Sequence, residues 1–184
     1  MNTHAFIHIP KCAGFSVKRC IQDNNLPIRI FDHGVIFSNI PPRLKQIIVI
    51  RDPIDRFTSA FYYIKGAYVK NTIFNNPNEF LDELKLSTEE AKRFIKPQPH
   101  YHYVNGLRID TDWVFHPQSA WIDKPDIVML QENLQEDFDK LGFNVKLPRI
   151  NVSPRSDFRY SKENIDYLHN LYRQDFEFYN KEKR

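Results

Sequence analysis

Residues 6–16 have the sequence FIHIPKCAGFS, which joins a short apolar run to a helical pattern through a tight turn. The apolar residues 6–9 are followed by a proline and predict a buried strand. The turn contains Lys11 and Gly14, and the helix after it directs N–H groups and the positive end of its dipole into the same space. Ser16 adds a hydroxyl donor. The stretch therefore predicts an anion-binding loop with a mobile cation beside it.

This loop differs from the best-known nucleotide-binding patterns. The Walker A pattern places its lysine after the glycine-rich loop, whereas Lys11 precedes the turn, and no Ser or Thr follows it to hold magnesium. The GxGxxG dinucleotide fingerprint is also missing. The alternative interpretation is an ordinary strand–turn–helix connection that carries a surface lysine.

Residues 47–61, with the sequence IIVIRDPIDRFTSAF, repeat the arrangement with different chemistry. The β-branched run predicts a strand of a buried parallel sheet. Arg51 follows this run, at the carboxyl end where open α/β sheets bind ligands, and arginine suits bidentate contact with phosphate. Ser59 lies about two helical turns further on, so it can meet the same phosphate from the side. The alternative is that Arg51 pairs with Asp52 or Asp55 and that Ser59 is a surface hydroxyl.

The rest of the chain alternates strand and helix patterns, which predicts an α/β fold. We expect a single domain over residues 1–184, with three layers and a mainly parallel central sheet flanked by helices. Further strands are predicted at 28–31 and 126–130. Helices are predicted after Gly14, from 53 towards 65, from a capping box at 87–90, between 133 and 142, and from Ser161 along one apolar stripe to Tyr179. The pattern over residues 100–125 indicates no particular structure.

Composition narrows the class of protein further. The 184 residues are 41% hydrophobic and 14% aromatic, enough for one core, and a formal net charge of +3 is too small to indicate a nucleic-acid partner. No apolar run approaches the roughly 20 residues that a bilayer crossing needs, so no membrane partner is expected. Cys12 and Cys20 are too few for a disulfide framework and fit a reducing compartment. With no signal-peptide pattern, we expect a cytoplasmic protein.

Segments 10–16 and 51–59 together resemble the 3′-phosphoadenylyl sulfate (PAPS)-dependent sulfotransferases. The nearest branch is that of heparan sulfate 2-O-sulfotransferases and related carbohydrate sulfotransferases. Its members have a Pro-Lys-x-Gly-Gly-x-Ser-like loop for the 5′-phosphosulfate, and an Arg-Asp-Pro-x-x-Arg segment with a later serine for the 3′-phosphate. Here Ala13 replaces a common glycine and Phe15 stands where threonine is frequent. Segments 117–121, 130–138, 147–153 and 172–176 also resemble family elements.

The resemblance implies a P-loop-like sulfotransferase fold and PAPS as co-substrate, with no metal. It implies nine cofactor-binding residues: Lys11, Cys12, Ala13, Gly14, Phe15, Ser16, Arg51, Ser59 and Arg155. Lys11 is the catalytic cation, because negative charge grows on the bridging oxygen when the bond to sulfur breaks. His33 is the candidate base that the 2-O-sulfotransferase branch suggests, and Asp32 is its candidate orienting residue. The acceptor is expected to be a carbohydrate, with a small molecule or protein tyrosine left open.

Other interpretations remain open at the level of sequence. His100 and His102 are rival bases, or two ligands of a metal half-site, because alternate residues of an extended segment face the same side. Tyr101, Tyr103, Trp113 and Trp121 could stack on a sugar or simply belong to the core. The alternative functions are a P-loop-type nucleotide kinase or phosphotransferase and a non-catalytic nucleotide-binding module. The sequence does not indicate an oligomeric state.

Overall fold

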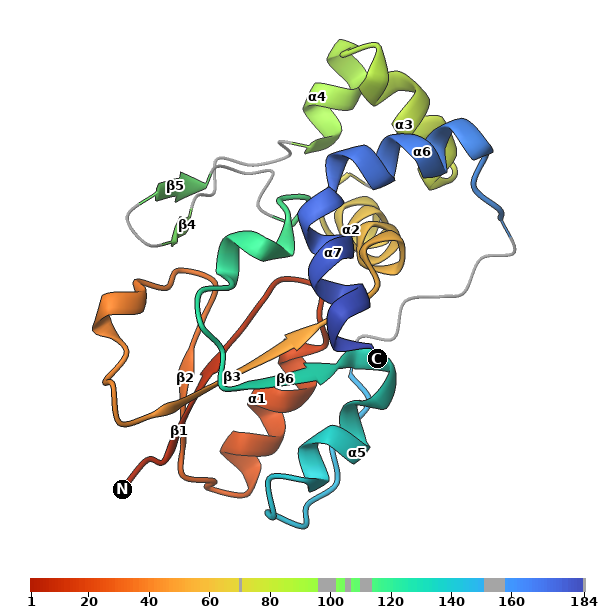
Figure 1. The fold of residues 1–184 in the computed structure, drawn as a ribbon. Helices are drawn as coiled ribbons and strands as arrows, with labels where there is room; N and C mark the ends of the chain where they lie inside the picture. Colours follow the sequence, from red (N-terminus) through yellow and green to blue (C-terminus); the bar gives the residue numbers. More distant parts are fainter. Residues whose placement is uncertain (70, 96–101, 105–106, 110–113, 151–157, 184) are drawn as a thin grey trace.

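The computed structural model describes residues 1–69, 71–95, 102–104, 107–109, 114–150 and 158–183. Within these residues lies a four-stranded sheet with the strand order β2-β1-β3-β6 (Figure 1). Every neighbouring pair in this sheet is parallel. The strands are β1 (His4–Ile7), β2 (Ile28–Phe31), β3 (Lys45–Ile50) and β6 (Ile127–Leu130). The prediction of an α/β fold with a parallel central sheet flanked by helices is therefore confirmed.

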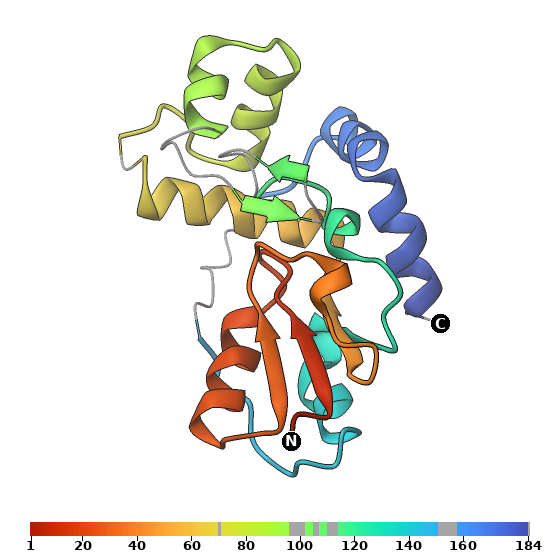
Figure 2. The same ribbon diagram turned by 90° about the vertical axis from the view of Figure 1, so that its left-hand side faces the viewer.

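The order in which successive strands are added to the sheet reverses at β1. The chain passes from β1 through α1 (Gly14–Asp23) to β2 on one side, and then returns to place β3 on the other side of β1. The loops that follow β1 and β3 therefore diverge from the carboxyl ends of these two strands. The point where such loops diverge is the usual ligand site of an open α/β sheet. The helix α5 (Leu134–Asp139) follows β6, and Figures 1 and 2 show α1 and α5 beside the sheet.

A second group of helices lies beyond the carboxyl ends of the strands (Figure 1). The longest, α2, begins where the Asp52 carboxylate accepts hydrogen bonds from the N–H groups of Ile54 and Asp55, with Pro53 in the first turn. An antiparallel hairpin lies nearby. The elements are α2 (Pro53–Ala67), α3 (Pro77–Lys85), α4 (Glu89–Ile95), β4 (His102–Val104), β5 (Leu107–Ile109), α6 (Lys162–Leu171) and α7 (Arg173–Glu182).

Two hydrophobic clusters correspond to these two groups of elements. One contains the apolar residues of β1 and β3, and the other is rich in phenylalanines from α2, α3 and α4. Helix α7 packs on both, since Phe176 belongs to the helical cluster and Tyr179 to the sheet cluster. The described residues also contain three short 3₁₀ helices, namely η1 (Phe37–Asn39), η2 (Gln118–Trp121) and η3 (Gln131–Asn133).

Some element boundaries differ from those predicted. The single C-terminal helix expected from Ser161 is two helices, broken at Tyr172, whose backbone leaves helical geometry while its hydroxyl donates to the Phe115 carbonyl. Helix α3 was not predicted, although Asn76 caps it and Pro77 occupies its first turn. Asn133, predicted as a cap, makes no side-chain capping bond.

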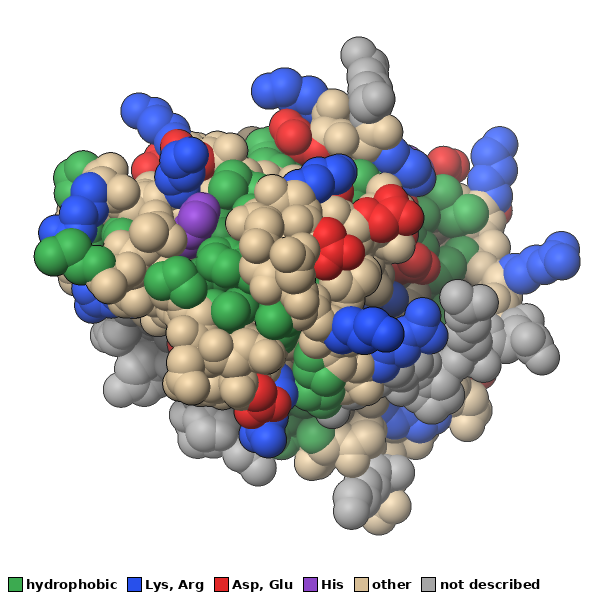
Figure 3. Space-filling view, turned by 90° about the horizontal axis from the view of Figure 1, so that it is seen from below, with side chains coloured by type: hydrophobic (Ala, Val, Ile, Leu, Met, Phe, Trp, Pro, Cys, Tyr) green, Lys and Arg blue, Asp and Glu red, His purple; other side chains and the backbone are tan. Residues whose placement is uncertain are grey.

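The face opposite the helical group carries charges of both signs among scattered apolar side chains (Figure 3). No helix in the described ranges is long and apolar enough to cross a membrane.

Candidate functional site

Lys11 and Arg51 occupy the loops that diverge from neighbouring strands β1 and β3. Arg51 is the first residue after β3, and Lys11 follows β1 by a short turn. The pairing of β1 with β3 places both loops at the same edge of the sheet. The two charges are close enough for Arg51 to lower the pKa of Lys11. The predicted juxtaposition of the two cationic motifs is therefore present in the fold.

The Lys11 loop turns sharply because two of its residues adopt left-handed backbone conformations. Lys11 has φ 64° and Ala13 has φ 57°. The first helical bond of α1 runs from the Ser16 N–H to the Ala13 carbonyl at 3.0 Å. In the described part of the chain, the N–H groups of residues 12–15 have no hydrogen-bond acceptor. These amides stand at the N-terminal end of a ten-residue helix, and they are available to an anion.

Gly14 is required in this loop for a reason that the sequence pattern did not suggest. A Cβ atom on Gly14 would lie 1.8 Å from Cδ2 of His8, so the His8 ring occupies the space that a side chain would need. From the sequence alone, we expect the glycine to allow close approach of a ligand. The structure shows that it admits the buried His8 imidazole against the start of α1.

Lys11 is a partly buried cation held over an aromatic ring. Its Nζ lies 4.1 Å from the centre of the Tyr63 ring, which comes from α2. The pKa of Lys11 is lowered from 10.5 to about 8, mainly by burial and to a smaller extent by the charges of Arg51 and Arg56. A negative ligand would relieve this repulsion, so the loop is electrostatically prepared for one.

Arg51 has a buried donor with no partner among the described residues. Its Nε atom is inaccessible to solvent and has no hydrogen-bond acceptor. The alternative pairing with Asp52 or Asp55 is not found among the described ion pairs, and Asp52 instead caps α2. An orphaned arginine donor beside a lysine of lowered pKa fits an anionic group better than a structural ion pair.

The remaining predicted cofactor residues are placed as follows. Ser16 and Ser59 are buried polar residues, at 6% and 5% exposure, in α1 and α2 respectively, so Ser59 is not a surface hydroxyl. Phe15 is exposed at 57%. Cys12 is buried, and burial raises the pKa of its thiol to about 11. Arg155 lies outside the described residues.

Arg56, which sequence analysis left without a role, fixes the Lys11 loop from α2. This side chain is fully buried, and its Nε donates to the Pro10 carbonyl at 3.0 Å. Its Nη2 donates to the carbonyls of Val114 and His116 at 3.3 and 2.6 Å. The guanidinium therefore joins the loop after β1 to the segment before η2. In the sequence, Arg56 could be recognised only as the second arginine of the Arg-Asp-Pro-x-x-Arg pattern.

His33 lies beside the Lys11 loop, and its ring is oriented by the backbone. His33 Nδ1 lies 2.9 Å from the His8 carbonyl oxygen, which can only accept, so Nδ1 carries the proton and Nε2 of the neutral ring has the lone pair. Trp121 Nε1 donates to the His33 carbonyl at 2.8 Å. The two imidazoles of His8 and His33 are in contact, with centroids 4.1 Å apart.

The hydrogen bonds found for Asp32 join it to His8 and Lys18, while the ring of His33 is oriented by the His8 carbonyl. The Asp32 carboxylate contacts His8 Nδ1 at 3.2 Å and accepts a hydrogen bond from Lys18 at 2.7 Å. Burial opposes ionisation of Asp32, but the hydrogen bonds from Lys18 and His8 prevail and lower its pKa. Burial lowers the pKa of His8 itself, because the Asp32 contact compensates only in part. Sequence reasoning missed His8, although it is a polar residue within an apolar run.

The rival histidines and the candidate sugar-stacking residues are only partly covered by the described residues. His100, Tyr101 and Trp113 lie outside the described residues, and His102 and Tyr103 lie in β4. Trp121 is fully buried, so it belongs to the core and offers no stacking surface. Among the described residues, no group of three or more His, Cys, Asp or Glu could hold a metal ion.

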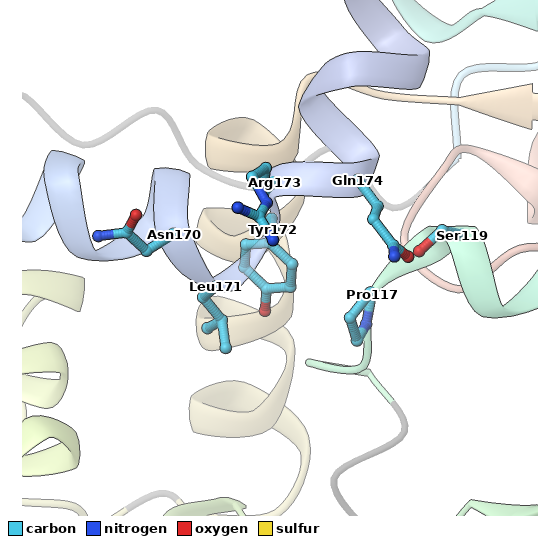
Figure 4. Close-up of a pocket in the computed structure, with 7 residues that line it drawn as sticks. All are labelled: Pro117, Ser119, Asn170, Leu171, Tyr172, Arg173 and Gln174. Carbon is cyan, nitrogen blue, oxygen red and sulfur yellow. The ribbon is translucent and has the colours of Figure 1, made fainter.

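A separate pocket of about 200 Å³ lies where η2 meets the junction of α6 and α7 (Figure 4). The pocket is lined by residues 117, 119 and 170–174. None of these residues belongs to the two cationic motifs. We therefore identify the candidate site by the Lys11 and Arg51 loops and not by this pocket.

Comparison with known proteins found no matching family model, no matching curated protein and no matching solved structure.

Proposed function

We propose that this protein is a PAPS-dependent sulfotransferase with a P-loop-like sulfotransferase fold. The observation that carries the proposal is the pair Lys11 and Arg51 at the point where the sheet reverses direction. Lys11 has a lowered pKa and Arg51 has an orphaned buried donor. Two cations on separate loops suit a ligand with two phosphate groups, and the sequence motifs around them resemble those of this enzyme class.

The Lys11 loop is assigned to the 5′ end of the nucleotide. The N–H groups of residues 12–15 and the dipole of α1 would hold its phosphate. The nucleotide supplies an activated sulfuryl group, whose transfer leaves negative charge on a phosphate oxygen. Lys11 would stabilise that charge, and this interaction is stronger in the transition state than in the ground state. A positive charge is needed for this role; with a pKa of about 8 Lys11 carries that charge at neutral pH, and a bound anion would raise the pKa further.

Arg51 and Ser59 are assigned to the 3′-phosphate. Arg51 presents a rigid fork of donors, of which Nε has no partner among the described residues. Ser59 is buried in the second turn of the helix that begins just after Arg51. Arg155 remains a further candidate for the same phosphate or the adenine.

His33 is the proposed base that removes the proton from the acceptor hydroxyl. The His8 carbonyl fixes the tautomer in which Nε2 can accept that proton. The acceptor O–H bond then breaks as its oxygen bonds to sulfur. A carbohydrate is the proposed acceptor, and a cytoplasmic location, consistent with the free buried cysteines, is part of the proposal.

Calorimetry with adenosine 3′,5′-bisphosphate and with ATP plus magnesium tests the nucleotide assignment. Preference for the bisphosphate is the expected result, and preference for ATP would favour the kinase alternative. An acceptor screen with labelled PAPS then separates an enzyme from a non-catalytic binding module. Binding of the bisphosphate without transfer to any acceptor would leave the module as the better description.

A further inference from the structure

Gln118 makes contact with both cationic motifs at once. Its Nε2 donates to the Arg51 carbonyl at 2.9 Å, and its Oε1 accepts from the Arg51 N–H at 3.2 Å. The same Oε1 accepts from the Cys12 thiol at 3.4 Å. Gln118 is only 1% exposed, so water does not compete for these contacts. A single buried amide therefore joins the loop after β1 to the loop after β3.

The hydrogen bonds with Gln118 replace those that the Arg51 backbone would make to a neighbouring strand. The ladder between β3 and β6 ends at the pair Ile50 and Leu130, so Arg51 is the first residue with no neighbouring strand there. The amide of Gln118 takes the place of such a strand, because it offers one donor and one acceptor to the same peptide groups. Arg51 is thereby fixed in backbone direction before its side chain meets a ligand.

The contact with Cys12 fixes the other loop. Burial raises the pKa of Cys12 to about 11, so the thiol keeps its proton and acts as the donor. Its side chain also reaches the Pro10 carbonyl at 3.5 Å, which is the carbonyl that Arg56 holds. The Gln118 amide is therefore connected to the part of the Lys11 loop that is already restrained.

Gln118 is itself held by the C-terminal helix. Its backbone N–H donates to Oδ2 of Asp175 at 2.7 Å, and the N–H of Ser119 donates to Oδ1 at 2.8 Å. Asp175 is a buried residue of α7. Figure 4 shows residues next to this contact, with Ser119 of η2 facing the exposed Gln174 of α7.

We infer that Gln118 is a positioning residue that sets the separation of Lys11 and Arg51, so that the two phosphate groups of one nucleotide are bound together. The inference rests on the proposed function. Gln118 acts through Arg51 and needs no contact with the ligand. Loss of Gln118 would leave the Arg51 peptide groups without a buried partner and free to reorient.

A double-mutant cycle measures this dependence. The variants are Gln118→Leu, Arg51→Ala and the double variant, with Gln174→Leu as the control on α7. Binding of adenosine 3′,5′-bisphosphate is measured by calorimetry for each. Residues in one hydrogen-bond network couple strongly, so Gln118→Leu should weaken binding roughly tenfold in the wild-type background and less than about twofold in Arg51→Ala. Gln174→Leu should leave the affinity unchanged.

Asp175→Asn provides a second variant if Gln118→Leu does not fold, because it weakens the support of Gln118 and leaves the amide in place. Its effect should also shrink in the Arg51→Ala background. Equal losses in both backgrounds would mean that Gln118 has only a structural role, and would overturn the inference while the proposed function stood. A wild-type protein that does not bind the bisphosphate would refute the proposed function and the inference with it.

Discussion

Lys11 should reduce the stability of the protein in the absence of a ligand, and its replacement by methionine measures the cost. Burial and two neighbouring arginines lower the pKa of Lys11 from 10.5 to about 8. Each pKa unit corresponds to about 1.4 kcal/mol, so the charge would destabilise the native state at neutral pH by about 3 kcal/mol at most. The contact with the Tyr63 ring favours the charged form and offsets part of this. We therefore expect Lys11→Met to raise the free energy of unfolding at neutral pH by about 1–3 kcal/mol.

The pH dependence gives this prediction its sign. Lys11 of the unfolded chain stays protonated up to about pH 10.5, whereas in the native state it loses its proton near pH 8. Between these values the unfolded state binds more protons, so this residue makes the wild type more stable as pH rises. Lys11→Met removes that contribution. The advantage of the variant should therefore be largest below pH 8 and shrink by more than half at about pH 10.

Urea unfolding of both proteins at neutral and alkaline pH gives the difference directly. Lys18→Met is the matched control, because Lys18 lies on α1 next to the loop but is paired with Asp32 at 2.7 Å. Removing Lys18 should not stabilise the protein. Under the proposed function, the same Lys11→Met sample should lose sulfuryl transfer, since the cation assigned to the leaving oxygen is removed. If Lys11→Met is no more stable than the wild type, or if its advantage does not change with pH, the electrostatic argument is wrong.

Further variants test the neighbouring residues. Arg51→Ala should weaken binding of adenosine 3′,5′-bisphosphate more than tenfold, because a charge-assisted hydrogen bond is worth about 1.5–3 kcal/mol. Calorimetry should show that the affinity for 5′-AMP barely changes. Equal weakening of both ligands would refute the assignment of Arg51 to the 3′-phosphate. Gly14→Ala should cost about 1–3 kcal/mol in urea unfolding, because its Cβ would overlap the His8 ring; an unchanged midpoint would contradict that packing. Ala13→Gly should instead stabilise by about 1 kcal/mol by relieving φ 57°. His33→Ala should lower single-turnover rates by about 10²–10⁴ with unchanged bisphosphate affinity, and normal turnover would leave the rival histidines as bases.

The elements that could be predicted from the sequence are those with local causes. The β-branched run before Arg51 is a strand because its side chains are buried on both faces, and Asp52 with Pro53 begins a helix whatever surrounds them. The break at Tyr172 has a distant cause, since its hydroxyl bonds to Phe115 on another segment. An apolar stripe at helical spacing continues through that position and could not reveal it. Similarly, the ladder of β1 ends at Ile7, two residues before the apolar run does.

The same distinction separates the predicted from the unpredicted parts of the site. Lys11 and Arg51 could be assigned because each follows its own strand, and parallel neighbours bring the carboxyl ends of their strands to one edge. The residues that orient them come from elsewhere in the chain: Arg56 reaches back to Pro10, and Gln118 reaches both Cys12 and Arg51. Spacing along the chain can mark Arg56 through the Arg-Asp-Pro-x-x-Arg pattern, but it does not reveal which distant groups these side chains contact, because the fold must exist before those contacts do. If the proposed function holds, the cations are thus encoded locally and their relative geometry is set by the tertiary structure, so substitutions far from the two motifs should alter how well both phosphates are bound at once.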